Sequence, residues 1–161
     1  MGNVTTAESY AHALTAGDYA PATTTGHFSH ATTTGDGGRA TTAGNFSHAT
    51  TVGDDAHATT AGNGSHALTA GDYAHATTTG RLAHALAAGD LAKTSVSGEN
   101  SIAAAFGANS AARAANGGFI VLAQYNGDTV VAVKTAQAGK DGIKPDTWYK
   151  LSPTGEFVEA E

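Results

Sequence analysis

Glycine recurs every nine residues along most of this chain, without a slip. The glycines that keep this spacing are Gly17, Gly26, Gly35, Gly44, Gly53, Gly62, Gly71, Gly80, Gly89, Gly98 and Gly107. The clearest copy between two of them reads Gly-Asp-Tyr-Ala-His-Ala-Thr-Thr-Thr, at residues 71–79. A fixed short period means that one small structural unit is stacked on copies of itself. The repeat therefore sets the architecture of most of the chain.

Alternate copies differ, so the structural unit is two copies long. We call the copies that start at residues 8, 26, 44, 62 and 80 odd, and those that start at 17, 35, 53, 71 and 89 even. The second position of the even copies is always Asp: Asp18, Asp36, Asp54, Asp72 and Asp90. The fifth position of the odd copies is always His: His12, His30, His48, His66 and His84. The period is thus eighteen residues, and residues 8–115 hold six such coils, the last two degraded.

The composition of each copy favours strands over helices. Gly costs about 1 kcal/mol in a helix interior, and Thr, Ser, Asn and Asp are also poor helix formers. The fourth, sixth and eighth positions are small in almost every copy, whereas the fifth accepts Arg39 and Lys93. Alternate residues of a strand share one face, so the small set lies inside and the variable set faces water. The sequence predicts an all-β fold, a parallel β-solenoid with two short strands in each coil.

Two features of the coil follow from this interpretation. The Gly-Asp or Gly-Asn pair is expected to form the corner, where a positive φ is needed. A column of Thr at the eighth position is expected inside, each hydroxyl finding its partner in the neighbouring coil. This column comprises Thr15, Thr24, Thr33, Thr42, Thr51, Thr60, Thr69 and Thr78.

Composition excludes several classes of protein. The chain of 161 residues has no Cys, so it has neither a disulfide framework nor thiolate chemistry. Residues 1–7 resemble no secretion signal, and no apolar run approaches the roughly 20 residues that span a bilayer. The net charge of −6 without basic clusters predicts no direct binding of nucleic acid. We expect a protein that is cytoplasmic as synthesised in a host cell, or a component of a virus particle.

The repeat ends near residue 116, and the composition changes there. Residues 119–125 and 129–135 predict two strands around the turn at Asn126-Gly127-Asp128, and residues 147–151 and 155–158 predict a second hairpin. The chain is therefore divided into a lead-in (1–7), a solenoid (8–115) and a small antiparallel β region (116–161). This last region is interpreted as a cap on the open strand edges or, alternatively, as a binding face made by Tyr125, Trp148 and Tyr149.

Three ligand-binding hypotheses arise from the columns, and each is weaker than a structural explanation. Histidines about 4.8 Å apart suit a divalent metal, but a column repeated with its coil is more simply a surface feature. The Asp column offers too few oxygens for calcium, so its carboxylates are expected to accept corner amides. A Thr array on the even copies suggests ice binding, but the neighbouring column mixes Pro21, Arg39, His57, His75 and Lys93. We predict no metal and no cofactor.

Enzymatic function is not expected. The chain has many His and Ser residues, but no nucleophile elbow, phosphate-binding loop or metalloprotease helix motif. We therefore predict no catalytic residue.

The clearest functional signal is an apolar stripe on the odd copies. Aromatic residues and leucines flank the histidines there, a pattern typical of interfaces. The interface candidates are Tyr10, His12, Leu14, Phe28, His30, Phe46, His48, His66, Leu68, Leu82, His84 and Leu86. We expect self-association into a dimer or trimer, weakened on acidification if the histidines lie in the interface.

Two sequence motifs carry a resemblance. The His-Ala-Thr-Thr-Thr-Gly repeats, followed by Gly-Gly-Phe-Ile-Val-Leu-Ala and Ile-Lys-Pro-Asp-Thr-Trp-Tyr-Lys-Leu, resemble a family of uncharacterised phage and prophage proteins over nearly the whole chain. The Ala-x-Ala spacing with periodic Gly is more distantly similar to the heads of trimeric autotransporter adhesins. The first resemblance implies a viral origin and supplies no known active site.

Two functions remain open on this basis. The first is a structural or protein-binding module that acts through an oligomeric surface. The second is a cytoplasmic inhibitor of a host defence system, similar in kind to an anti-CRISPR protein or a nucleic-acid mimic, whose partner is a host protein complex. For the second, an Asp spacing of about 4.8 Å is shorter than the spacing of phosphates on a nucleic acid.

Overall fold

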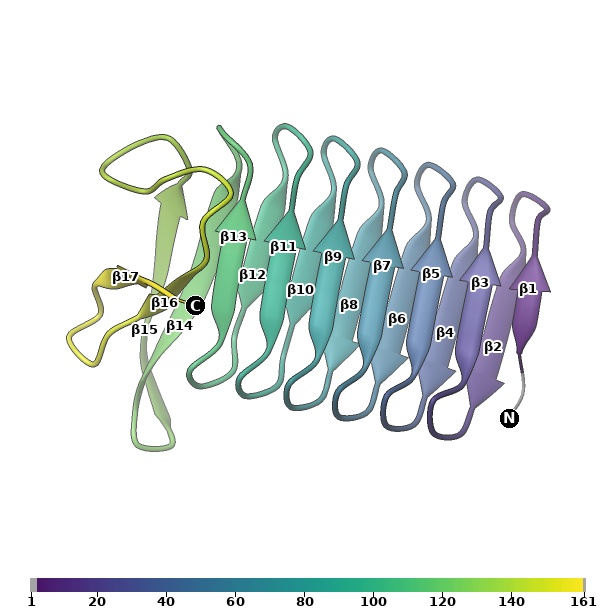
Figure 1. The fold of residues 1–161 in the computed structure, drawn as a ribbon, viewed down its shortest axis with the longest axis horizontal. Helices are drawn as coiled ribbons and strands as arrows, with labels where there is room; N and C mark the ends of the chain where they lie inside the picture. Colours follow the sequence, from purple (N-terminus) through teal and green to yellow (C-terminus); the bar gives the residue numbers. More distant parts are fainter. Residues whose placement is uncertain (1–2, 161) are drawn as a thin grey trace.

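The computed structural model describes residues 3–160, and the strands are the only regular secondary structure in these residues. Figure 1 shows a rod of stacked coils in which two sheets face each other, with the C-terminal hairpins at one end. Each sheet grows along the rod by parallel pairing of alternate strands. The fold is therefore the predicted parallel β-solenoid with antiparallel strands at the C-terminal end.

The even copies and the odd copies form separate sheets. The first sheet, sheet A, contains β1 (Val4–Thr6), β3 (Pro21–Thr24), β5 (Arg39–Thr42), β7 (His57–Thr60), β9 (His75–Thr78), β11 (Lys93–Val96), β13 (Ala111–Ala114), β16 (Tyr149–Leu151) and β17 (Phe157–Glu159). The second, sheet B, contains β2 (His12–Ala16), β4 (His30–Thr34), β6 (His48–Val52), β8 (His66–Ala70), β10 (His84–Ala87), β12 (Ile102–Ala105), β14 (Phe119–Asn126) and β15 (Thr129–Gln137).

The rod has about seven turns, one more than the repeat predicts. Val4–Thr6, placed in the lead-in by the sequence, pairs in parallel with β3. Phe119–Leu122, placed after the repeat, pairs in parallel with β12. Neither segment carries the repeat glycine, so the pattern alone misses both. Met1, Gly2 and Glu161 of the terminal segments lie outside the described residues.

The predicted alternation of side chains is confirmed. The sixth-position alanines, from Ala13 to Ala85, are 0–1 % exposed and form the central line of the core. Fourth-position Ser and Ala are also buried from Ala20 onward, and fifth-position residues face outward. Buried serines of the odd copies are fully bonded: Ser47 Oγ donates to the Gly26 carbonyl oxygen at 3.1 Å and accepts from the Ser29 amide at 3.2 Å. The core is therefore thin, made of small side chains and closed by hydrogen bonds.

The predicted explanation for the glycines, a positive φ, covers only some of them. A Cβ at Gly62 would lie 2.0 Å from the carbonyl oxygen of Gly44 in the preceding coil, and most other repeat glycines face the same obstacle. Only Gly17, Gly35, Gly53 and Gly71 among them have a φ in the left-handed region, at 115–159°. The repeat glycine is thus required by close backbone approach between coils, which a single coil considered alone does not contain.

A second positive φ, which the sequence did not predict, falls one residue after the Gly-Asp or Gly-Asn pair, at the third position. Tyr19, Phe28 and Leu82 there have φ of 55–57°. A left-handed conformation costs a residue with a Cβ about 1–2 kcal/mol. Repetition of this conformation at almost every corner means that stacking of the coils overcomes this cost. The prediction of a positive φ in the Gly-Asp pair is confirmed at Gly17, Gly35, Gly53 and Gly71, but it missed the positive φ at the third position.

The expected pairing of the buried Thr column is also wrong. The Oγ1 atoms of the column, for example in Thr33, Thr51 and Thr69, are buried and have no hydrogen-bond partner among the described residues. These residues pair in register on successive strands, so their side chains are separated by the strand spacing of about 4.8 Å. An O–H···O hydrogen bond needs about 2.5–3.0 Å. The hydroxyls are stacked too far apart to bond to each other.

Both predicted C-terminal hairpins are present, but they do not form a sheet of their own. The hairpin β14–β15 extends sheet B, and the hairpin β16–β17 joins sheet A through an antiparallel pairing of Tyr149 with Ala112. Ile120 and Leu122 take the inward places that alanines hold in β12. The core therefore widens from alanine to large side chains at this end, and the hairpins cover the last turn.

Candidate interaction face

The outer surface of sheet B carries no ionised side chain along the repeat. None of β2, β4, β6, β8, β10 and β12 contains Asp, Glu, Lys or Arg. Their outward positions hold His at the fifth position, or Ile102 in β12, and Leu, Thr or Ala at the seventh. We call this surface the histidine face. It brings together eight of the twelve predicted interface residues: His12, Leu14, His30, His48, His66, Leu68, His84 and Leu86.

The histidines of this face form one continuous column. Parallel in-register pairing places each imidazole above the next, with ring centroids 4.7–4.9 Å apart. Most neighbouring rings are stacked, whereas His66 and His84 meet edge to face at 84°. Burial, followed by the neighbouring imidazoles, lowers the pKa of His30 and His66. A charged imidazole is disfavoured in such a column because it repels a charge on either neighbouring imidazole.

The seventh-position residues add exposed apolar surface beside the column. Leu14, Leu68 and Leu86 are 67 %, 38 % and 37 % exposed. Between the two columns lies a hollow of about 240 Å³, bounded by His48, His66, His84, Leu68 and Leu86. Thr50 occupies a seventh position in β6, and its shorter side chain lines one side of this hollow. The face is nearly flat, apolar and imidazole-lined.

The remaining four predicted interface residues lie in the corners rather than on the face. Tyr10, Phe28 and Phe46 stack ring on ring, with centroids 5.2 and 5.3 Å apart, at the corners that lead into β2, β4 and β6. The Phe46 ring covers Gly64 in the next coil, since a Cβ there would lie 2.7 Å from it. Leu82 is 60 % exposed at the corner before β10. These side chains support the corners through contact along the rod.

The outer surface of sheet A has a different chemistry. Its fifth positions include the cations Arg39 and Lys93 around the stacked pair His57 and His75, whose rings are 4.9 Å apart. Burial is the main cause that lowers the pKa of both histidines, with further lowering from Arg39 for His57 and from His57 and Lys93 for His75. The predicted Thr column stands beside them, half-buried from Thr23 to Thr77. The two faces of the rod are therefore chemically distinct, as the sequence indicated.

The Asp column acts as the sequence predicts, as a row of acceptors for corner amides. Each carboxylate accepts the amide of the equivalent residue one coil later: Asp54 Oδ1 accepts from Asp72 N at 2.9 Å, and Asp72 Oδ1 from Asp90 N at 2.8 Å. The odd copies use the same bond with other acceptors, Asn63 Oδ1 for Arg81 N and His27 Nδ1 for Asn45 N. This second row is not visible in the sequence, because its residues differ in type and share only an acceptor atom.

The three C-terminal binding candidates lie in separate environments. Tyr149 is 3 % exposed and belongs to the core, and its hydroxyl accepts the Lys144 amide at 2.9 Å. The Tyr125 hydroxyl donates to the Phe106 carbonyl oxygen at 2.6 Å. Trp148 lies under two cations, Lys93 at 5.5 Å and Arg113 at 4.8 Å from its ring centroid. Each of the three fastens a hairpin to the solenoid.

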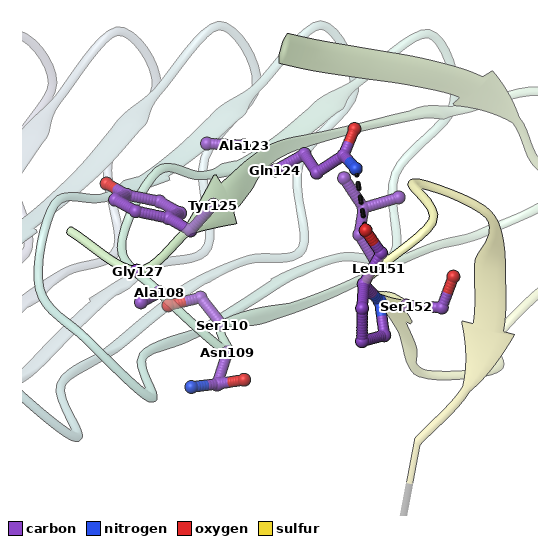
Figure 2. Close-up of a pocket in the computed structure, with 10 residues that line it drawn as sticks. Ala108, Asn109, Ser110, Ala123, Gln124, Tyr125, Gly127, Leu151 and Ser152 are labelled. Atoms are coloured by element: carbon purple, nitrogen blue, oxygen red, sulfur yellow. Dashed lines mark hydrogen bonds between the residues drawn. The ribbon is translucent and has the colours of Figure 1, made fainter. Parts of the chain in front are cut away.

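A pocket of about 230 Å³ lies where the last coil meets the hairpins. Figure 2 shows Gln124 directed towards the β16–β17 turn, where its Nε2 donates to the Pro153 carbonyl oxygen at 3.0 Å. The lining groups are amides, hydroxyls and small apolar side chains, such as Asn109, Ser110 and Ser152, with no ionisable acid or base other than the Tyr125 phenol. The pocket is smaller than the 300–1,000 Å³ typical of small-molecule sites.

Comparison with known protein families, with curated proteins and with solved structures finds no match to this chain. The fold itself defines the class of protein, a parallel β-solenoid closed at one end by two hairpins. Residues 3–160 include no helix that is long and apolar enough to cross a membrane. In the same residues, no group of three or more His, Cys, Asp or Glu side chains is placed to hold a metal ion.

Proposed function

We propose that this chain is a non-catalytic β-solenoid that works by binding, and that its histidine face binds a second copy of the chain. The observation that carries the proposal is the lack of ionised side chains on six successive strands, combined with exposed Leu14, Leu68 and Leu86. Charged residues are depleted at the cores of protein interfaces, and contiguous exposed apolar patches mark interaction sites.

A second copy suits this face better than a charged partner. Two copies related by a two-fold axis place the same surface against itself. Any net charge on that surface would therefore face a charge of the same sign across the interface and repel it. The histidine face has none while its imidazoles are neutral. Its columns are straight and repeat at the strand spacing, so leucines of one copy fit beside the histidines or threonines of another. Association would cover leucines that folding of the alanine core leaves in water.

The test compares two charge insertions on opposite faces. Leu68→Glu places a carboxylate in the centre of the histidine face, and Thr59→Glu places one at the same position of a strand in sheet A. Sedimentation at pH 7.5 should show the unmodified chain and the Thr59→Glu variant as dimers of twice 15.9 kDa, and the Leu68→Glu variant as a monomer. A monomeric unmodified chain, or equal effects of the two variants, would overturn the proposal.

The origin proposed with this function is a bacteriophage, on the basis of the sequence resemblance. A second candidate function is inhibition of a host defence complex, acting in the host cytoplasm. It is supported by the row of exposed Asp carboxylates, each held in one orientation by a hydrogen bond. Affinity capture from host lysate tests it: recovery of one stoichiometric defence complex, lost when Asp54 and Asp72 become Asn, would favour this candidate over self-association.

A further inference from the structure

The histidine column has a geometry that suits a metal ion shared by two neighbouring imidazoles. A Zn–N bond of about 2.0–2.1 Å places the centre of each imidazole roughly 3.2 Å from the ion. If the N–Zn–N angle lies between the square-planar and the tetrahedral value, the centres of the two bound rings are about 4.5–5.2 Å apart. The observed centroid distances of 4.7–4.9 Å fall within this interval for all four adjacent pairs.

To share an ion, neighbouring rings of the column have to change orientation. The stacked rings lie face to face, so their lone pairs have to turn towards a common point. Rotation about χ2 of His is soft, because this torsion has broad minima. His66 and His84 already meet at 84°, which shows that the column accepts tilted rings. His30 Nδ1 has no hydrogen-bond partner among the described residues, so no hydrogen bond at this atom has to break when the ring turns.

Electrostatics distinguish this column from the histidine pair on sheet A. A neutral imidazole offers a ring-nitrogen lone pair to a metal. No lysine or arginine stands on the histidine face. His57 and His75, by contrast, lie between Arg39 and Lys93, and both cations act on the adjacent ring. A divalent cation is therefore repelled at the second pair and accepted at the column.

We propose that adjacent histidines of the column His12, His30, His48, His66 and His84 bind divalent transition metal ions, Zn²⁺ or a metal of similar preference, in pairs. Imidazole is a preferred ligand of Zn²⁺, Cu²⁺ and Ni²⁺. Each site has two protein ligands, and water completes the coordination, so binding is exchangeable. Five histidines make at most two separate pairs at once, which gives up to two ions per chain. The inference does not depend on self-association.

Two double variants that remove the same number of histidines test this arrangement. His30→Gln with His66→Gln leaves His12, His48 and His84, no two of which are adjacent. His12→Gln with His84→Gln leaves His30, His48 and His66, which keep two adjacent pairs. All four side chains point outward, so circular dichroism and thermal melting should show both variants folded. ZnCl₂ alone is the probe, titrated calorimetrically at pH 7.5.

We expect the unmodified chain and the His12/His84 variant to bind Zn²⁺, and the His30/His66 variant to bind at least about ten-fold more weakly, a loss of about 1.4 kcal/mol. The single variant His57→Gln should bind as the unmodified chain does. Absence of Zn²⁺ binding, equal loss in the two double variants, or loss in His57→Gln would overturn the proposal. Sedimentation of the same proteins in EDTA reports on self-association separately, so failure of one proposal is distinguishable from failure of the other.

Discussion

At the scale of the residue, the buried threonines are the least expected feature of this protein. The β-branched shape of Thr is favourable in a strand. The hydroxyl of each inward Thr, however, is fully buried and has no hydrogen-bond partner among the described residues. A buried unpaired hydroxyl costs about 1–3 kcal/mol. The chain itself shows the alternative, because Val96 occupies the eighth position of its copy, 1 % exposed, in register with Thr78.

Thr51→Val should therefore stabilise the protein. The substitution preserves shape and removes an unpaired hydroxyl, so the free energy of unfolding should rise by about 1 kcal/mol. Urea denaturation measures the change. Thr59→Val is the control, since it makes the same replacement at an outward position and contributes only the strand preference of Val. A decrease for Thr51→Val would mean that the hydroxyl has a partner in solution.

At the scale of the element, the strands and corners are held by columns that repeat one bond in every coil. The Asp column is the clearest example, with a carboxylate-to-amide hydrogen bond between successive corners from Asp18 to Ala108. Acceptor chemistry matters more than charge, since Asn45 and Asn63 make the same bond in the odd copies.

Asp54→Ala should lower the free energy of unfolding by about 1 kcal/mol, because it removes the acceptor of the Asp72 amide. Asp54→Asn keeps the acceptor and should remain close to the unmodified protein. Chemical denaturation of the three proteins side by side gives the comparison. If Asn is as harmful as Ala, the negative charge rather than the hydrogen bond supports the corner.

The histidine columns make stability depend on pH. Burial, followed by neighbouring imidazoles, lowers the pKa of His30 and His66 below the ordinary value of 6.5. Burial also lowers the pKa of His57 and His75, with further lowering from Arg39 for His57 and from His57 and Lys93 for His75, partly opposed by Asp55. The unfolded chain then binds more protons than the folded chain once the pH falls below about 6.5, so the free energy of unfolding decreases with acidification through this range.

Thermal melting at pH 7.5 and pH 5.5 should show this loss, and His30→Gln with His66→Gln should make it smaller. His30 faces His12 and His48, and His66 faces His48 and His84, so the double variant also relieves repulsion within the column. The same loss in this variant as in the unmodified chain would assign the pH dependence to other groups.

At the scale of the whole molecule, the rod is closed at one end by a change in core size. The alanine line gives way to Ile120, Leu122 and Tyr149 where the two hairpins join the two sheets. Figure 1 shows both hairpins beyond β12 and β13, at the C-terminal end. In a solenoid, each coil is stabilised mainly by its neighbours, so a large side chain at the end fixes the last turn.

Leu122→Ala should consequently cost about 2–5 kcal/mol, the range for a large buried side chain cut to Ala. Leu91→Ala removes the same atoms from an exposed corner outside the histidine face and should change the free energy of unfolding far less. Urea denaturation of both variants provides the measurement. Equal effects would mean that the hairpins are not held by this part of the core.

The sequence by itself determined the class of fold, the inside and outside of each strand, the chemical difference between the two faces and the acceptor role of Asp. These follow from periodicity, because every coil meets a copy of itself and the same choice is repeated in each. Only the tertiary structure decided why the glycines are needed, where the positive φ falls, that the Thr hydroxyls are unpaired and that both hairpins extend existing sheets. Each of these depends on distances between coils, such as the approach of Gly62 to the Gly44 carbonyl oxygen, which no local pattern in a single strand contains.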